Sequence, residues 1–139
     1  MTPTGSAQVR DLCGDRVTHC YVPYDLPDAV RRFLDRVRPE IAIVAETEFW
    51  PNIFGECGRR GIPLLLVNGA RDTQVPVADL HLVASTLPGA PKDVWVNPNG
   101  RHMGSDPDWS TERIRTQVVN PWLVKQLKTD MREKRAAHQ

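Results

Sequence analysis

Residues 41–67, "IAIVAETEFWPNIFGECGRRGIPLLLV", carry the clearest signal of the fold class. The stretch begins with residues 41–45, a continuous apolar run rich in β-branched side chains, which is typical of a strand covered on both faces. The pattern of residues 50–60 predicts a helix, and Gly61 stands where a C-terminal cap is expected. Residues 64–67 form another short apolar run. A strand, a helix and a strand in this order are typical of an α/β domain with a parallel sheet.

Upstream of this stretch, the sequence predicts further alternating elements. A short helix begins near the N-terminus with Ser6 as its cap, and residues 17–22 are a strand candidate. The clearest helix follows, with Asp25 placed to cap it, Pro27 in its first turn and Pro39 as its stop. Its apolar side chains form one stripe, so we expect that face to be buried.

Downstream of it, residues 77–87 read as a helix and residues 93–98 as a strand. A long helical region runs from about residue 110 towards residue 135, and Pro121 should kink or restart it, because proline removes a helix hydrogen bond. We therefore predict one domain over residues 1–139. It is a small three-layer, Rossmann-like α/β domain with about four parallel strands and right-handed crossovers.

Composition and charge exclude several classes of function. The 139 residues are 40% apolar and 25% charged, an ordinary globular mixture with a net charge of +1. Residues 1–71 carry nine basic and nine acidic side chains, so no basic stripe for nucleic acid is expected. No apolar run approaches the roughly 20 residues of a membrane helix, and the N-terminus is unlike a signal peptide. We expect a cytoplasmic chain.

The cysteines do not favour a metal site. Cys13, Cys20 and Cys57 form no CxxC pair, and a zinc site that adds His19 would need adjacent side chains on opposite faces of a strand to converge. Free thiols are the preferred interpretation, and we expect neither a metal nor a cofactor.

Three segments, "TPTGSAQVRDLCGDRV", "YVPYDLPDAVRRFLDRVRPEIAIVAETEFWPN" and "RRGIPLLLVN", lie within residues 2–71. Together they resemble the N-terminal domain of Kdo transferase, the glycosyltransferase that adds 3-deoxy-D-manno-octulosonic acid (Kdo) to lipid A. The resemblance implies one half of a GT-B enzyme with CMP-Kdo as its donor. It also implies that Glu46 and Glu48 lie on the acceptor side of the cleft, where ligands of open α/β sheets bind. Alternatively, either carboxylate merely caps the following helix.

The sequence departs from this family in two respects. The resemblance implies a catalytic Glu in a Gly-rich loop upstream of the residues seen here, and a nucleotide-binding domain after residue 71. Neither is found in the sequence. Because sugar transfer needs a positioned donor and a base, we expect no catalysis from the chain as given.

Residues 63–128 resemble instead the C-terminal part of an α/β-hydrolase, through "PLLLVNGARDTQVPVADLHLVAS", "PGAPKDVWVNPNGRHMG" and "VVNPWLVKQL". By this resemblance Asp72 is the acid and His102 the base of a catalytic triad. Arg101 departs from the small residue usual in such loops. The G-x-S-x-G nucleophile motif is absent, so the favoured interpretation is structural. Asp72 then satisfies turn amides, and His102 hydrogen-bonds to it.

The two resemblances meet inside "PLLLVN", residues 63–68, and we interpret the chain as a chimera of residues 1–66 and 67–139. Three hypotheses follow, namely a Kdo transferase-like fragment, a hydrolase-like fragment without its nucleophile, and a non-catalytic folding or assembly unit. The small sheet leaves strand edges open to another chain, so we also expect a homodimer.

Overall fold

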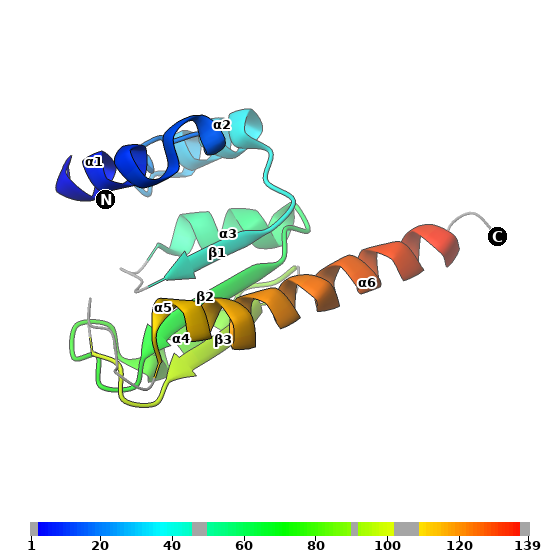
Figure 1. Cartoon of the computed structure of the whole chain (residues 1–139). Helices are drawn as coiled ribbons and strands as arrows, with labels where there is room; N and C mark the ends of the chain where they lie inside the picture. The colour runs from blue at the N-terminus through cyan, green and yellow to red at the C-terminus, as the bar shows by residue number, and fades with distance from the viewer. Residues whose placement is uncertain (1–2, 46–49, 90–91, 102–108, 137–139) are drawn as a thin grey trace. The chain divides into compact units, whose positions relative to one another are not determined.

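The computed structural model describes residues 3–45, 50–89, 92–101 and 109–136. The chain divides into two compact units, Met1–Arg38 and Pro39–Gln139, and each is described by itself (Figure 1). The prediction of a single domain over residues 1–139 stays a prediction.

The first unit is helical. It contains α1 (Pro3–Cys13), a short 3₁₀-helix η1 (Gly14–Arg16) and α2 (Pro27–Val37). Pro27 is the first residue of α2, as predicted, and its fixed φ suits that position. Arg38 ends α2 in a left-handed conformation with φ 48°, and its N–H donates to the carbonyl of Leu34 at 2.8 Å.

Two capping predictions in this unit were wrong. Ser6 lies inside α1 and is buried, because this helix begins at Pro3. Leu26, and not Asp25, occupies the N-cap position of α2. In both cases a proline inside the first turn marks the start of the helix better than the polar residue nearby.

The predicted strand over residues 17–22 was also wrong. The segment is irregular, and Val17, Tyr21 and Val22 are 45%, 52% and 46% exposed. An apolar run forms a strand only where a neighbouring strand pairs with it, and the described residues provide none here. The sheet of the described residues accordingly has three strands where about four were predicted.

The second unit is built on a parallel sheet of β1 (Ala42–Ala45), β2 (Leu64–Gly69) and β3 (Lys92–Asn97), in the order β1-β2-β3. The predicted small α/β fold is therefore confirmed. The central strand β2 is buried at every position, whereas Ile43 on β1 is 40% exposed. The apolar run of β1 was expected to be covered on both faces, and it is only partly covered.

Helices connect these strands as predicted. The first connection, α3 (Pro51–Arg59), ends at Gly61, which has φ 71°. The N–H of Gly61 donates to the Gly58 carbonyl at 3.2 Å and that of Ile62 to the Cys57 carbonyl at 2.9 Å, which is the Schellman pattern. The second connection is α4 (Val77–Thr86).

The C-terminal helical region changes its geometry along its length. It consists of α5 (Thr111–Ile114), a π-helical segment η2 (Arg115–Val119) and α6 (Asn120–Ala136). Pro121 lies in the first turn of α6, where the α-helix starts again after the π-helical segment. The predicted restart at this proline is confirmed, and its physical reason is the missing N–H donor.

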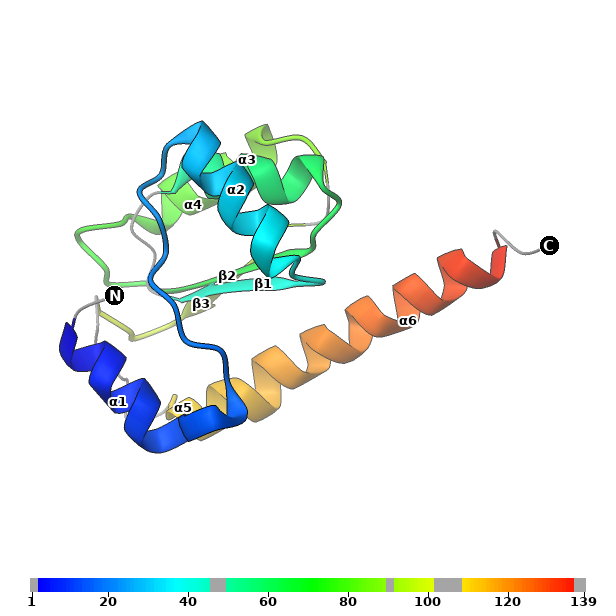
Figure 2. The ribbon, with the colours of Figure 1, turned by 90° about the horizontal axis from the view of Figure 1, so that it is seen from above.

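The two faces of the sheet pack against different helices, which gives the second unit three layers (Figure 2). Alternate residues of a strand point to opposite faces. On the face covered by α3 and α4, called the α3/α4 face, Leu64 and Leu66 pack with Phe54, Leu80 and Val83. On the other, called the α6 face, the buried residues are Leu65, Val67 and Trp122.

Candidate functional site at the carboxyl edge of the sheet

All three strands end at the same edge of the sheet, because they are parallel. Ala45, Gly69 and Asn97 are the last residues of β1, β2 and β3. Glu46 and Glu48 follow Ala45 in the sequence but lie outside the described residues. Their predicted place on the acceptor side stays a prediction.

The loops that follow β2 and β3 are joined by backbone hydrogen bonds. The N–H of Ala70 donates to the carbonyl of Asn97 and that of Arg71 to the carbonyl of Gly100, both at 2.8 Å. A Cβ atom on Gly69 would collide with the backbone of Gly100, so only glycine allows the loops to approach this closely. These contacts hold the loops after β2 and β3 in place relative to each other at this edge of the sheet.

Asp72 lies in the loop after β2, where the hydrolase resemblance requires an acid. Its side chain is buried, and its Oδ1 accepts hydrogen bonds from the N–H groups of Gln74 at 2.8 Å and Val75 at 3.0 Å. This is an Asx-type turn, which favours the structural interpretation. His102 lies outside the described residues, so the pairing of Asp72 with His102 stays a prediction.

Two buried asparagines were missed by the sequence analysis. Asn68 on β2 is 1% exposed and its Nδ2 donates to the carbonyl of Val75 at 2.9 Å. Asn97 at the end of β3 is also buried. Within the described ranges, the Oδ1 atoms of both side chains have no hydrogen-bond partner, so each can accept from a water molecule or a ligand. The sequence signal that could have identified both residues is an Asn placed directly after an apolar strand run.

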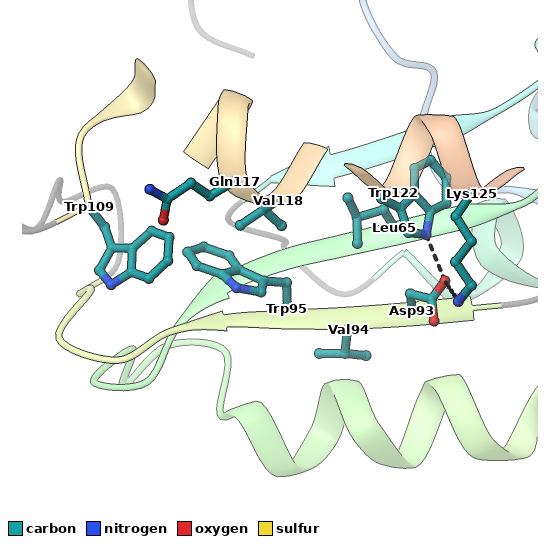
Figure 3. A pocket seen from close by; sticks show the side chains of 9 residues that line it. All are labelled: Leu65, Asp93, Val94, Trp95, Trp109, Gln117, Val118, Trp122 and Lys125. Atoms are coloured by element: carbon teal, nitrogen blue, oxygen red, sulfur yellow. Dashed lines mark hydrogen bonds and ion pairs between the residues drawn. The ribbon is translucent and has the colours of Figure 1, made fainter. Parts of the chain in front are cut away.

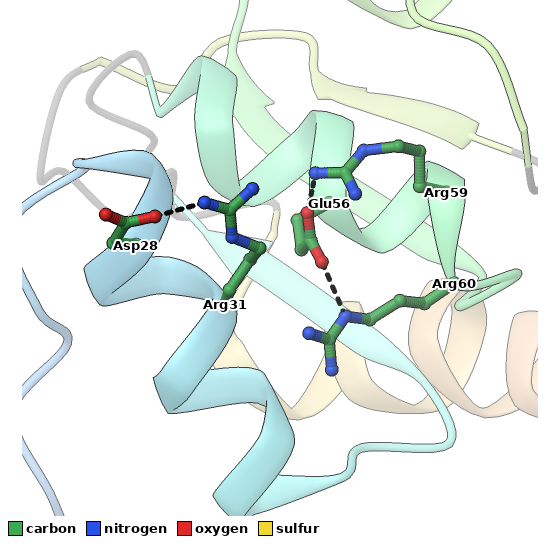
Figure 4. A network of polar contacts seen from close by, with 5 residues as sticks. All are labelled: Asp28, Arg31, Glu56, Arg59 and Arg60. Carbon is green, nitrogen blue, oxygen red and sulfur yellow. Dashed lines mark hydrogen bonds and ion pairs between the residues drawn. The ribbon is translucent and has the colours of Figure 1, made fainter.

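A buried carboxylate on α3 is paired with two arginines (Figure 4). Glu56 is 4% exposed; Arg59 donates to its Oε2, and Arg60 Nε donates to its Oε1 at 2.7 Å. Removing one partner from a buried pair leaves an uncompensated charge, so this cluster stabilises α3 only while it is complete. The Asp28–Arg31 pair of α2, drawn in the same figure, is solvent-exposed and contributes little.

The cysteines have different environments. Cys57 is buried in α3, and this burial raises the pKa of its thiol, although the nearby charges of Arg60 and Lys92 oppose the shift. A protonated thiol is a poor nucleophile, so Cys57 belongs to the core. Cys20 is exposed and Cys13 half-buried. Across residues 3–45, 50–89, 92–101 and 109–136, no three His, Cys, Asp or Glu side chains are grouped to hold a metal ion.

No helix in the described part of the chain is both long enough and apolar enough to cross a membrane. The predicted cytoplasmic location stays a prediction.

Comparison with known proteins bears on residues 1–74. They match the family model described as 3-deoxy-D-manno-octulosonic-acid transferase (kdotransferase). The 3-deoxy-D-manno-octulosonic acid transferase of Haemophilus influenzae is 46% identical over 67 residues, which are 48% of this chain and 16% of that protein. The enzyme of the same name from Bordetella pertussis is 36% identical over 72 residues, 48% of this chain and 17% of that protein.

A plant protein of Arabidopsis thaliana, named probable 3-deoxy-D-manno-octulosonic acid transferase, mitochondrial, is 38% identical over 58 residues, 42% of this chain and 13% of that protein. The chain thus spans about one sixth of the length of the bacterial relatives it matches. No solved structure matches it significantly. The hydrolase resemblance of residues 63–128 and the chimera stay predictions.

Proposed function

The chain belongs to the 3-deoxy-D-manno-octulosonic-acid transferase (Kdo transferase) family, and we propose that residues 1–74 form the acceptor-binding part of such an enzyme. The acceptor is a lipid A-type glycolipid, and the sugar comes from CMP-Kdo. Transfer further requires a held donor and a base that deprotonates the acceptor hydroxyl. We therefore assign to this part the binding and orientation of the acceptor, and to the complete enzyme the transfer itself.

One observation carries this proposal. Glu46 follows directly on Ala45, the last residue of β1, in a sheet whose three strands are all parallel. Ligands of open α/β sheets bind beyond the carboxyl ends of the strands. We propose that the carboxylates of Glu46 and Glu48 accept hydrogen bonds from acceptor hydroxyls, which makes them positioning residues for the glycolipid.

The test is a calorimetric titration that measures the binding of detergent-dispersed lipid A to the 139-residue chain. We expect saturable binding that weakens at least about tenfold, or roughly 1.4 kcal/mol, in the double variant Glu46→Gln/Glu48→Gln. The matched control is Glu40→Gln, because Glu40 is an exposed carboxylate before β1 and hence at the opposite edge of the sheet. Equal affinity in all three proteins, or no binding by the unaltered chain, would refute the proposal.

A hydrolase remains the second candidate, because Asp72 lies in the loop after β2, where that resemblance expects its acid. The Asx-type turn around Asp72 argues for a structural role, so we expect no hydrolysis of p-nitrophenyl acetate above background. Turnover that disappears in His102→Ala would reverse this assignment and would reveal an unrecognised nucleophile.

We also propose that the chain forms a homodimer. Support comes from Val124, Leu127 and Met131, which form an exposed apolar stripe along α6 with exposures of 48%, 60% and 55%. Two-fold pairing would cover this stripe on both copies at once. Light scattering coupled to size exclusion should give twice the mass of 15.7 kDa, and a monomer that persists at high concentration would contradict the proposal.

A further inference from the structure

A cavity of about 360 Å³ lies on the α6 face of the sheet, and Trp109, from the segment that follows β3, lines one end of it (Figure 3). Asp93 and Trp95 of β3 form its floor, and Gln117 of the π-helical segment with Trp122 of α6 form its roof. This volume lies within the usual range of small-molecule sites, roughly 300–1,000 Å³. The cavity is open to solvent, so a ligand can enter it, and π-helical segments are frequent at functional sites.

Two indole rings shape one end of the cavity. The ring centroids of Trp95 and Trp109 are 4.8 Å apart, and the ring planes meet at 63°. The guanidinium carbon of Arg113 lies 4.3 Å from the centroid of the Trp109 ring, so a cation already occupies one face of that ring. Between the two rings lies an apolar surface that includes an aromatic ring face. Because such a face carries partial negative charge, it attracts polarised C–H groups.

The other end of the cavity is polar. Trp122 Nε1 donates to Asp93 Oδ2 at 2.6 Å, and Lys125 Nζ lies 3.8 Å from the same oxygen. The carboxylate and the ammonium form a solvated ion pair, so this end of the cavity presents both signs of charge. Asp93 Oδ1 and the Lys125 ammonium provide an acceptor and a donor side by side, because the carboxylate has several lone pairs and the ammonium three N–H groups.

The charged side chains of Asp93, Arg113 and Lys125 determine which class of ligand the cavity can bind. A cationic ligand is disfavoured, because Arg113 lies on Trp109 and Lys125 lies at the polar end. An anionic ligand would meet the Asp93 carboxylate. A neutral pyranose ring carries no charge, so it meets neither electrostatic penalty. Its C–H face can stack against the indole rings of Trp95 and Trp109. Its hydroxyl groups, which both donate and accept, can pair with Asp93, Lys125 and the Nε2 of Gln117. The Oε1 of Gln117 accepts from Arg113 Nε at 3.2 Å.

We propose that this cavity binds a neutral pyranoside. The side chains proposed to contact the ring come from β3 and the C-terminal helical region, and Leu65 of β2 also lines the cavity. Neither Glu46 nor Glu48 is among them, so this site can fail while acceptor binding through those two carboxylates stands, and the reverse also holds. The affinity should be weak, with a dissociation constant on the order of 1 mM, because one small ring buries little area.

The test uses methyl β-glucopyranoside as the probe, with choline and benzoate as cationic and anionic comparison ligands. The chain has four tryptophans, and each gives its own indole N–H signal in a nitrogen–proton correlation spectrum. We expect saturable shifts of Trp95, Trp109 and Trp122 with the pyranoside. Trp50, which packs on the α3/α4 face, should not shift and serves as the internal control.

Two variants probe the polar contacts without removing an aromatic wall. Asp93→Asn and Gln117→Ala should weaken pyranoside binding at least about fivefold, while Gln126→Ala, a change outside the cavity lining, should not. An unchanged Trp50 signal shows that each variant is folded. The proposal is overturned if the pyranoside shifts no cavity signal, if choline or benzoate saturates the cavity at lower concentration, or if the two variants bind as the unaltered chain does.

Discussion

The two faces of one sheet have different chemistry and different packing. On the α3/α4 face, Phe54, Leu64, Leu66 and Leu80 are 0% exposed. On the α6 face, the large side chains are indoles accompanied by a carboxylate, an ammonium and a cavity of about 360 Å³. One face of the sheet therefore supplies most of the packing that stabilises the second unit. The other face is packed less completely.

Side-chain shape explains the difference. The leucine and phenylalanine side chains on α3, α4 and β2 pack against one another with almost no exposed surface, as expected of a close-packed interior. Indole rings are larger and carry an N–H that needs a partner, so Trp122 is directed towards Asp93 and does not fill the space beside Trp95. Figures 1 and 2 also show α6 extending past the end of the strands.

The largest expected effect is the loss of a side chain from the α3/α4 face. Phe54→Ala removes a fully buried ring and should lower the free energy of unfolding by roughly 3–5 kcal/mol. Urea denaturation measures this loss. The control is Leu82→Ala on α4, where 61% exposure predicts a change within about 0.5 kcal/mol. Similar losses in the two variants would remove the distinction between core and surface.

A smaller effect is expected where α3 meets the loop after α4. A Cβ atom on Gly58 would collide with the backbone carbonyl of Pro88, so Gly58→Ala should cost about 1–3 kcal/mol. On the same helix, a Cβ on Gly55 would lie 3.9 Å from Leu87, an ordinary contact. Gly55→Ala should therefore be neutral or stabilise α3 by up to about 1 kcal/mol. Thermal unfolding of both variants checks the prediction, and a stabilising Gly58→Ala would contradict the close approach.

The α6 face should respond more weakly. Trp122→Phe keeps an aromatic ring but removes the N–H bond to Asp93, and the expected loss is about 1–2 kcal/mol. The Asp93 carboxylate is partly exposed and stays solvated, which limits the cost. A double-mutant cycle with Asp93→Asn measures the coupling. Strict additivity of the two substitutions would show that this hydrogen bond contributes nothing to stability.

The smallest effect concerns Cys57 at alkaline pH. Because burial raises the pKa of this thiol in the folded state, its contribution to stability is fully present below the thiol pKa of the unfolded chain. That contribution is lost as the pH rises through the folded-state pKa. The free energy of unfolding should thus fall with rising pH, and less steeply in Cys57→Ala. Thiol-reagent kinetics give an independent check, since exposed Cys20 should react before Cys57.

Sequence patterns predicted those parts of the fold that local chemistry determines. The apolar runs of β1 and β2, the cap at Gly61 and the restart at Pro121 were all readable from neighbouring residues. Residues 17–22 were not, because a strand depends on a partner that its own residues do not specify. The cavity was equally hidden, since Asp93 and Trp122 are 29 positions apart and meet only after β3 and α6 have packed.

The two faces of the sheet differ in how much they contribute to the free energy of unfolding, and two adjacent residues of β2 test this difference most directly. Leu66 points to the α3/α4 face and Leu65 to the α6 face, where it lines the cavity; they are 0% and 2% exposed. In urea denaturation Leu66→Ala should cost roughly 3–5 kcal/mol and Leu65→Ala about 2–3 kcal/mol, because the space left by Leu65 joins an existing cavity. Equal losses, or a larger loss for Leu65→Ala, would contradict this account.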